Sequence, residues 1–279
     1  MAARIEIASE AGACYGVERA LRMVEDAAKT STVPVHTLGP LIHNPRVVDD
    51  LAAKGVTVVA SPEDSAGDTL LLRTHGVTPE EERRARELCH DVLDATCPFV
   101  KKVHLAASRL YREGYQVVVV GEAGHPEVEA TLPHAPGAVV VGDVSKVEEL
   151  PFCKKIGVVV QTTQSRSNLQ HVVSALLDRA EEVRVVNTIC DATSGHQGAC
   201  AELAARADVM IVIGGRISAN TKRLAEIAAE LCPRTYHIEG ADELDPSWLV
   251  GAGLIGITAG ASTPASQIDA VRRAIEAAI

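Results

Sequence analysis

The stretch Val92-Leu93-Asp94-Ala95-Thr96-Cys97-Pro98 joins a short apolar segment to a cysteine and then to a proline. Apolar and β-branched residues favour a strand, and proline favours the first position of a helix. Two related stretches occur elsewhere: Ile5-Glu6-Ile7 leads to Ala13-Cys14, and Val185-Val186-Asn187-Thr188-Ile189 leads to Cys190. The three cysteines divide the 279 residues into nearly equal thirds. One strand, cysteine and helix in each third predict three related units that share one centre.

Between the cysteines, short β-branched runs alternate with amphipathic stretches rich in Ala, Leu, Glu and Arg. This alternation is typical of α/β units with parallel strands. We expect an α/β protein of three pseudo-threefold-related lobes, at 15–96, 97–189 and 190–279, with the N-terminal segment 1–14 completing the third. The strands expected from these runs are Arg4–Ala8, Val33–Leu38, Thr69–Arg73, Val117–Gly121, Gly157–Gln161, Val209–Gly214 and Leu254–Thr258.

Composition excludes several classes of function. The formal net charge is −10 and aromatic residues make up 3%, so neither a basic surface nor stacking platforms for nucleic acid are expected. No apolar run is long enough to span a membrane and no leader pattern is visible, which favours a soluble cytoplasmic protein.

Seven cysteines, an odd number, are scattered without CxxC pairs. A secreted disulfide framework is therefore not expected, and a reducing compartment is favoured.

The three cysteines that end the quoted stretches are candidate metal ligands. A helix N-terminus lowers the pKa of a thiol and favours the thiolate that binds metal. Three soft ligands without partners at zinc-finger spacing favour an iron–sulfur cluster over zinc. A lone intracellular cysteine is more often a small buried apolar residue. That second interpretation is preferred for Cys89, Cys153, Cys200 and Cys232.

Polar residues follow six of the expected strands, those after the first, at the carboxyl ends where parallel sheets bind ligands. Together they could hold a phosphate through imidazole, hydroxyl and amide donors, although a solvated loop histidine is the ordinary alternative. The candidate donors lie at five of these strand ends and are His43, His75, His125, Ser218, Asn220 and Ser262.

Glu127 is the only carboxylate within these six strand ends. The ordinary interpretation is a solvated surface carboxylate, and the functional interpretation is proton delivery in a closed pocket. Thr162, at another strand end, could hold such a carboxyl group or a substrate hydroxyl, although threonine there often serves only as a cap.

Taken together, the motifs resemble the 4-hydroxy-3-methylbut-2-enyl diphosphate reductase family over nearly the whole chain and in the same order. The matching segments are Gly12–Ala20, His43-Asn44 with Val47-Val48, His75-Gly76-Val77, Asp94–Pro98, Gly124–Glu129, Gln161-Thr162-Thr163, Thr188-Ile189-Cys190, Ser218 with Asn220-Thr221, and Thr258–Ser262.

The resemblance implies three α/β lobes around a central [4Fe-4S] cluster held by Cys14, Cys97 and Cys190, with the fourth iron open to substrate. It implies that two electrons and two protons enter, water leaves, and isopentenyl and dimethylallyl diphosphates form. Ferredoxin or flavodoxin is the implied electron donor. Glu127 would deliver protons with Thr162 and His125 in its hydrogen-bond network. The diphosphate would be held by His43, His75, Ser218, Asn220 and Ser262.

The sequence departs from the family pattern at several positions. Ala13 replaces a usual Phe, Ala130 a usual Gly and His196 a usual Arg, while Ile217 and Ala219 stand where Asn and Ser are common. These changes also fit a paralogous [4Fe-4S] reductive dehydroxylase with a different substrate. A second alternative is a non-catalytic iron–sulfur sensor or binding protein that uses the same three cysteines.

Overall fold

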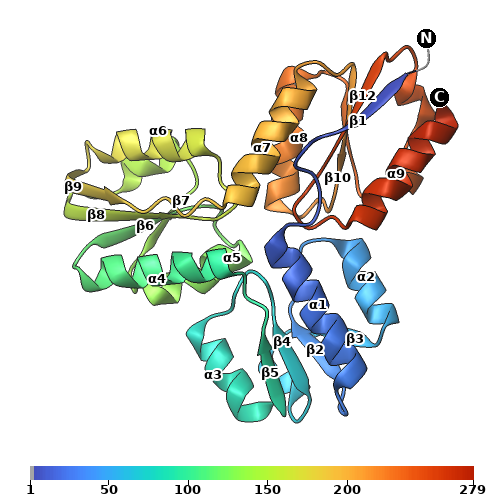
Figure 1. Cartoon of the computed structure of the whole chain (residues 1–279). Coiled ribbons are helices and arrows are strands. Elements are labelled where there is room, and N and C mark those ends of the chain that lie inside the picture. The colour runs from blue at the N-terminus through green and yellow to red at the C-terminus, as the bar shows by residue number, and fades with distance from the viewer. Residues whose placement is uncertain (1–2) are drawn as a thin grey trace. The chain divides into compact units, whose positions relative to one another are not determined.

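The computed structural model describes residues 3–279, so residues 1 and 2 of the expected N-terminal segment lie outside the described residues. The described chain forms three sheets, A, B and C, each with four strands that pair in parallel (Figure 1). The expected α/β class with small parallel sheets is confirmed.

Sheet B has the order β3-β2-β4-β5. Its apolar face packs Leu38, Leu70 and Leu72 near Ala85 of a covering helix. That helix begins after Thr78, whose side chain accepts from the Glu81 N–H while the Glu81 carboxylate accepts from the Thr78 N–H. The strands are β2 (Val35–Leu38), β3 (Val56–Val59), β4 (Thr69–Leu72) and β5 (Asp91–Asp94), and the helices are α1 (Tyr15–Thr30), α2 (Pro45–Ala53) and α3 (Pro79–Leu88).

Sheet C has the order β7-β6-β8-β9. Successive side chains of a strand point to opposite faces. Val118 and Val120 accordingly pack with the α6 side, and Val117 and Val119 with the α4 side. The strands are β6 (Gln116–Val120), β7 (Val139–Val141), β8 (Cys153–Val160) and β9 (Ala180–Val185), and the helices are α4 (Pro98–Arg112), α5 (Pro126–Thr131) and α6 (Arg166–Leu176).

Sheet A has the order β1-β12-β10-β11, so the first strand of the chain pairs with the last. Helices α7 and α8 cover one face and α9 covers the other (Figure 1). The strands are β1 (Arg4–Ile7), β10 (Val209–Ile213), β11 (Thr235–Ile238) and β12 (Leu254–Ala259), and the helices are α7 (Asp191–Ala204), α8 (Ala219–Leu231) and α9 (Ala265–Ala278). Short 3₁₀ helices lie at Pro62–Ser65, Leu132–His134, Val144–Glu149, Ala241–Glu243 and Pro246–Leu249.

The strand that precedes each of the three cysteines, β1, β5 or β9, occupies one edge of its sheet. The two strands that end in the polar segments occupy the centre, namely β2 and β4, β6 and β8, or β10 and β12. The strand order reverses between these two central strands, and such switch points are where parallel sheets bind ligands. Each sheet therefore presents its polar segments where a ligand site is expected.

The seven strands expected from the β-branched runs are present, with changes at their ends. The outer strands β3, β7 and β11 were not predicted. The strand expected to run from Val185 into Cys190 is wrong, since β9 ends at Val185. Beyond it, the Thr188 hydroxyl replaces the backbone ladder by donating to the Val160 carbonyl and accepting from the Val160 N–H.

The described chain divides into two compact units. One contains the N-terminal residues to Glu18, Ile42–Asp50 and Asp191–Ile279, and includes sheet A. The other contains Arg19–Leu41 and Leu51–Cys190, and includes sheets B and C.

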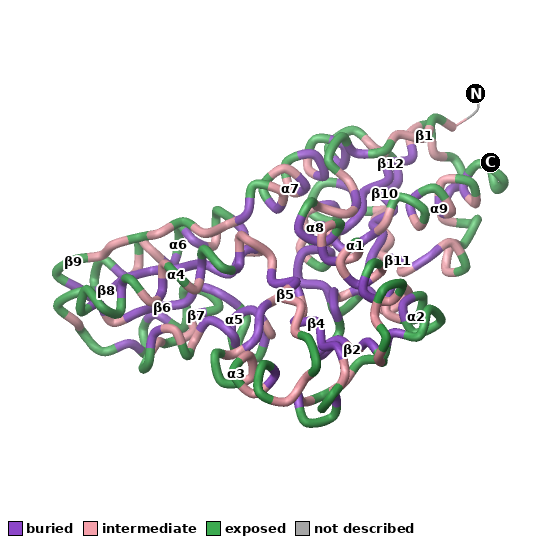
Figure 2. The backbone as a smooth tube through the Cα atoms, turned by 60° about the horizontal axis from the view of Figure 1, so that its bottom comes forward, coloured by how far each residue is buried: buried purple, intermediate pink, exposed green. Residues whose placement is uncertain are grey.

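Figure 2 shows the buried course of central strands such as β10, β12 and β4. The lobe boundaries expected from the sequence stay a prediction. Within 3–279, every helix is too short or too polar to cross a lipid bilayer.

Candidate functional site

Each of the three candidate ligand cysteines lies directly before a helix. Cys14 precedes α1, Cys97 precedes α4 and Cys190 precedes α7. The Cys14 carbonyl accepts from the Glu18 N–H at 2.9 Å, and the Cys97 carbonyl accepts from the Lys101 N–H at 3.1 Å. The expected placement of each cysteine at a helix start is confirmed. The positive end of the helix dipole favours a thiolate there.

In the unit that holds sheets B and C, backbone hydrogen bonds tie two of these cysteines to neighbouring strand ends. The Cys97 N–H donates to the Thr74 carbonyl at 3.0 Å, one residue before His75. The Cys190 N–H donates to the Thr162 carbonyl at 3.1 Å. Both cysteines are thereby fixed beside predicted substrate-binding residues, Cys97 beside His75 and Cys190 beside Thr162.

Glu127 and Thr162 form a buried pair in the same unit. The Thr162 N–H donates to Glu127 Oε1 and the Thr162 hydroxyl donates to Oε2, both at 2.7 Å. Glu127 is 2% exposed and Thr162 is 7% exposed. The surface-solvation interpretation of Glu127 is therefore wrong, and Thr162 does more than cap a strand.

Burial changes the acidity of this carboxyl group. Loss of hydration raises the pKa of Glu127 to about 7, although the two hydrogen bonds from Thr162 act in the opposite direction. A carboxyl group with such a pKa exchanges its proton near neutral pH. It has the acidity expected of a general acid in an enzyme that works at that pH.

The ring of His125 is oriented by the backbone of Glu127 at the start of α5. Its Nδ1 accepts from the Glu127 N–H at 3.1 Å, so the neutral ring carries its proton on Nε2. The rings of His75 and His125 meet edge to face, with centroids 5.5 Å apart. The contacts in this unit thus run from Cys190 through Thr162, Glu127, His125 and His75 to the loop of Cys97.

In the unit that holds sheet A, the end of β12 meets the His43 segment. The Asn44 side chain donates to the Ser262 carbonyl at 2.9 Å, and the Ser262 hydroxyl donates to the His43 carbonyl at 3.4 Å. The Cys14 N–H donates to the carbonyl of Ala261, the residue before Ser262. The side chain of Asn44 was not singled out from the sequence, although it follows His43 directly.

The third polar segment of this unit precedes α8. Gly215 approaches so closely that a Cβ there would lie 2.5 Å from the His43 carbonyl oxygen. The Ser218 hydroxyl accepts from the Thr221 N–H and caps α8. Asn220 is 4% exposed, yet within residues 3–279 neither atom of its amide group has a hydrogen-bond partner. A buried amide left unpaired is unfavourable, so this group is suited to a bound ligand.

His196, which departs from the family pattern, contacts the turn before Cys14. The side chain is 4% exposed, and its Nε2 lies 2.9 Å from the carbonyl oxygen of Gly12. Gly12 has φ of +98°, a backbone conformation that favours glycine. His196 therefore supports the turn that precedes Cys14.

Comparison with known proteins agrees with this geometry. Residues 5–276 match the family described as LytB protein. This chain belongs to the LytB protein family. The family resemblance found in the sequence motifs is thereby confirmed.

Curated relatives of this LytB chain are similar over nearly their whole length. A 4-hydroxy-3-methylbut-2-enyl diphosphate reductase of Geobacter sulfurreducens is 50% identical over 273 residues, which are 98% of this chain and 96% of the relative. One of Aquifex aeolicus is 46% identical over 276 residues, which are 98% of this chain and 96% of the relative.

Two solved structures are similar to it as well. One is (E)-4-hydroxy-3-methyl-but-2-enyl diphosphate reductase, described as the terminal enzyme of the non-mevalonate pathway. It is 46% identical and has a TM-score of 0.74, with 98% of this chain and 99% of that chain covered. The other is the E-1-hydroxy-2-methyl-but-2-enyl-4-diphosphate reductase of Plasmodium falciparum, at 28% identity and a TM-score of 0.91, with 96% and 86% covered.

The residues of this LytB chain suit an iron–sulfur cluster. Cys14 and Cys97 are partly exposed and Cys190 is 9% exposed, and each lies at the positive end of a helix dipole. Thiolates in such positions are the ligands that these clusters use. Of the other cysteines, Cys200 and Cys232 are buried as expected. Cys89 and Cys153 are only partly buried, because each lies at the margin of a core.

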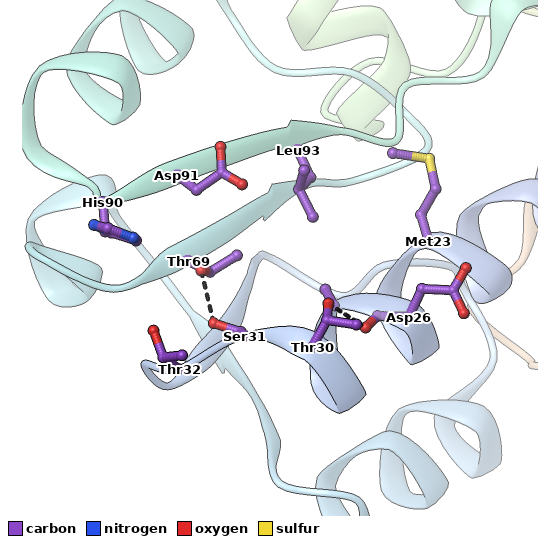
Figure 3. A pocket seen from close by; sticks show the side chains of 10 residues that line it. Met23, Asp26, Thr30, Ser31, Thr32, Thr69, His90, Asp91 and Leu93 are labelled. Carbon is purple, nitrogen blue, oxygen red and sulfur yellow. Dashed lines mark hydrogen bonds between the residues drawn. The ribbon is translucent and has the colours of Figure 1, made fainter.

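A separate cavity of about 550 Å³ lies beside sheet B (Figure 3). Thr69 and Asp91, which line it, are the first residues of β4 and β5. The cavity is therefore at the amino ends of these strands, whereas His75 and Cys97 follow their carboxyl ends. None of the site residues predicted from the sequence lines this cavity.

Proposed function

We propose that this chain reduces 4-hydroxy-3-methylbut-2-enyl diphosphate to isopentenyl and dimethylallyl diphosphates. The substrate takes up two electrons and two protons, its C–O bond to the hydroxyl group breaks, and water leaves. The observation that carries this proposal is the buried Glu127–Thr162 pair, with its two hydrogen bonds of 2.7 Å and a carboxyl pKa of about 7. This pair supplies the proton that an alcohol needs in order to leave as water.

We assign Cys14, Cys97 and Cys190 as the ligands of one [4Fe-4S] cluster. When bound, the cluster supplies single electrons and a Lewis-acidic iron that is open to the substrate hydroxyl. The support from this chain is the shared position of the three thiols before helices α1, α4 and α7. The backbone hydrogen bonds of these residues hold each thiol at a strand end.

Proton delivery follows from the hydrogen bonds around Glu127. The protonated carboxyl group can donate to the Thr162 hydroxyl, which can donate in turn to the leaving oxygen. The Thr162 N–H keeps the carboxyl group in place throughout, because it binds the other carboxyl oxygen. His125, with its proton on Nε2, adds a donor beside this route. Water is excluded from the pair because both side chains are buried.

We assign the diphosphate to the polar segments that follow the central strands. With a net charge of −10, the protein as a whole repels an anion, so local donors must bind it. The unpaired Asn220 amide is the most direct support among these donors. The other residues assigned to the diphosphate are His43, His75, Ser218 and Ser262.

The alternatives are less consistent with the residues. Ile217 is 55% exposed and so leaves the buried donors Ser218 and Asn220 in place, which weakens the case for a paralogue with another substrate. A non-catalytic sensor would gain nothing from a buried carboxyl group whose ionisation is unfavourable. Electron delivery by ferredoxin or flavodoxin, and a cytoplasmic location, form part of the proposal.

Single cysteine substitutions test the cluster assignment. Cys14→Ser, Cys97→Ser and Cys190→Ser are each expected to lose the cluster and turnover, because three thiolates act as one ligand set. Cys89→Ser and Cys232→Ser are matched controls and are expected to keep both. Iron and sulfide are measured in anaerobically purified protein. Full cluster occupancy in Cys190→Ser contradicts the three-ligand assignment.

A further inference from the structure

Arg19 binds the backbone that leads to Cys97. Its Nη2 donates to the Asp94 carbonyl at 3.0 Å, and its Nη1 lies 3.4 Å from the Ala95 carbonyl oxygen and 3.3 Å from that of Thr96. One guanidinium group therefore faces three successive carbonyl oxygens. The next residue along the chain is Cys97.

This arrangement requires a particular backbone shape. In an extended strand, successive carbonyl groups point to opposite sides, so one cation cannot meet three in a row. The chain curls after the end of β5 at Asp94, and the three negative carbonyl ends converge. Ala95 and Thr96 are buried, and buried carbonyl groups need a donor. Without Arg19, these converging dipoles lose the cation that faces them.

The planar shape of the guanidinium suits this role. Arginine presents several N–H groups in a fixed fork, whereas the lysine ammonium is a compact point charge. Arg19 is half-buried, so its charge is less screened than that of Arg22, which is exposed on the same helix. The charge also lies beside the loop of a proposed cluster ligand, and nearby charge helps to set a cluster's reduction potential.

We infer that Arg19 is a positioning residue for the iron–sulfur site: it holds the Cys97 loop in its curled form and raises the reduction potential of the cluster. This inference rests on the cysteine assignment made under the proposed function. Two consequences follow. Without the hydrogen bonds from the Arg19 guanidinium, the Cys97 loop is held less firmly and Cys97 releases iron more readily. Without the positive charge, the reduced cluster, which carries one more electron, is less favoured.

The test compares Arg19→Met with Arg22→Met, which makes the same chemical change at the exposed position. Iron loss to a chelator is followed anaerobically, and the reduction potential is measured by titration with spectroscopic detection. We expect Arg19→Met to lose iron about fivefold faster than Arg22→Met. We also expect the equilibrium between oxidised and reduced cluster to shift on the order of tenfold toward the oxidised form. A tenfold shift is about 59 mV for one electron.

A rate of iron loss or a potential equal to that of Arg22→Met overturns the inference. If Arg19→Met does not fold, Arg19→Lys decides, since it keeps the charge but not the fork. It is expected to keep the wild-type potential and lose iron several-fold faster, and a wild-type rate of iron loss overturns the inference. The wild-type iron and sulfide content is measured first. An unmodified protein that binds no cluster refutes the proposed function instead, so the two failures are distinguishable.

Discussion

Replacing Thr162 with valine tests whether the Glu127 carboxyl group controls turnover. Valine has nearly the shape of threonine but lacks the hydroxyl that donates to Glu127 Oε2 at 2.7 Å. The backbone N–H bond to Oε1 remains. The hydroxyl favours the ionised carboxyl group and lowers its pKa, so its removal raises the pKa above the value of about 7.

The size of this change follows from the type of hydrogen bond. A bond to a charged group contributes about 1.5–3 kcal/mol, and each pKa unit corresponds to about 1.4 kcal/mol. The pKa of Glu127 is therefore expected to rise by about 1–2 units in Thr162→Val. Turnover needs the protonated form, so wild-type turnover falls as the pH rises through about 7. In the variant this fall moves to about pH 8–9, and the maximum is lower because the hydroxyl relay is lost.

The assay is anaerobic steady-state turnover from pH 6 to 9 with a reduced viologen dye as electron source. Thr163→Val is the matched control for the threonine change, because the Thr163 hydroxyl bonds to Gln161 instead of Glu127. Glu127→Gln removes the acid, and Glu129→Gln makes the same change at an exposed position of α5. Iron content is matched in every sample. An unmoved pH profile in Thr162→Val, or near-normal turnover in Glu127→Gln, refutes the reasoning.

Three further predictions concern stability and substrate affinity. The pKa of Glu127 is raised by burial, so its contribution to stability is present below about pH 4.5 and is lost as the pH rises through about 7. Cluster-free Glu127→Gln should therefore be more stable than wild type at pH 8, by about 3 kcal/mol at most, and no more stable at pH 4, as measured by urea unfolding. Burial, with the neighbouring His134, lowers the pKa of His104 to about 4, so wild type should lose stability relative to His104→Gln as the pH falls from 6.5 to 4. Ala219→Ser should change KM by no more than about tenfold, the effect of one ordinary hydrogen bond, and a sharp gain in activity would instead favour the paralogue.

The parts of the site that depend on short-range sequence were predictable. Pro98 after Cys97 indicated a helix start, and α4 begins there. His43 and His75 were recognised because each follows an apolar run. The confirmed fold class came from the same local alternation of strands and helices. Such features need only a few neighbouring residues, so a single sequence can carry them.

Other features depend on residues that are distant in the sequence. Glu127 is buried and hydrogen-bonded to Thr162, 35 residues away, so its raised pKa could not be predicted from its own segment. The bonds from Arg19 span 75 to 77 residues. Beyond the end of β9, the Thr188 hydroxyl bonds both backbone groups of Val160, which is 28 residues away. These features required the tertiary structure.

The most direct measurement of the central claim is anaerobic turnover of 4-hydroxy-3-methylbut-2-enyl diphosphate by protein of known iron and sulfide content. Electron consumption and both products are quantified together. The proposed chemistry predicts two electrons used for each substrate reduced, with isopentenyl and dimethylallyl diphosphates as the products. A protein that carries its full cluster and leaves the diphosphate unchanged contradicts it.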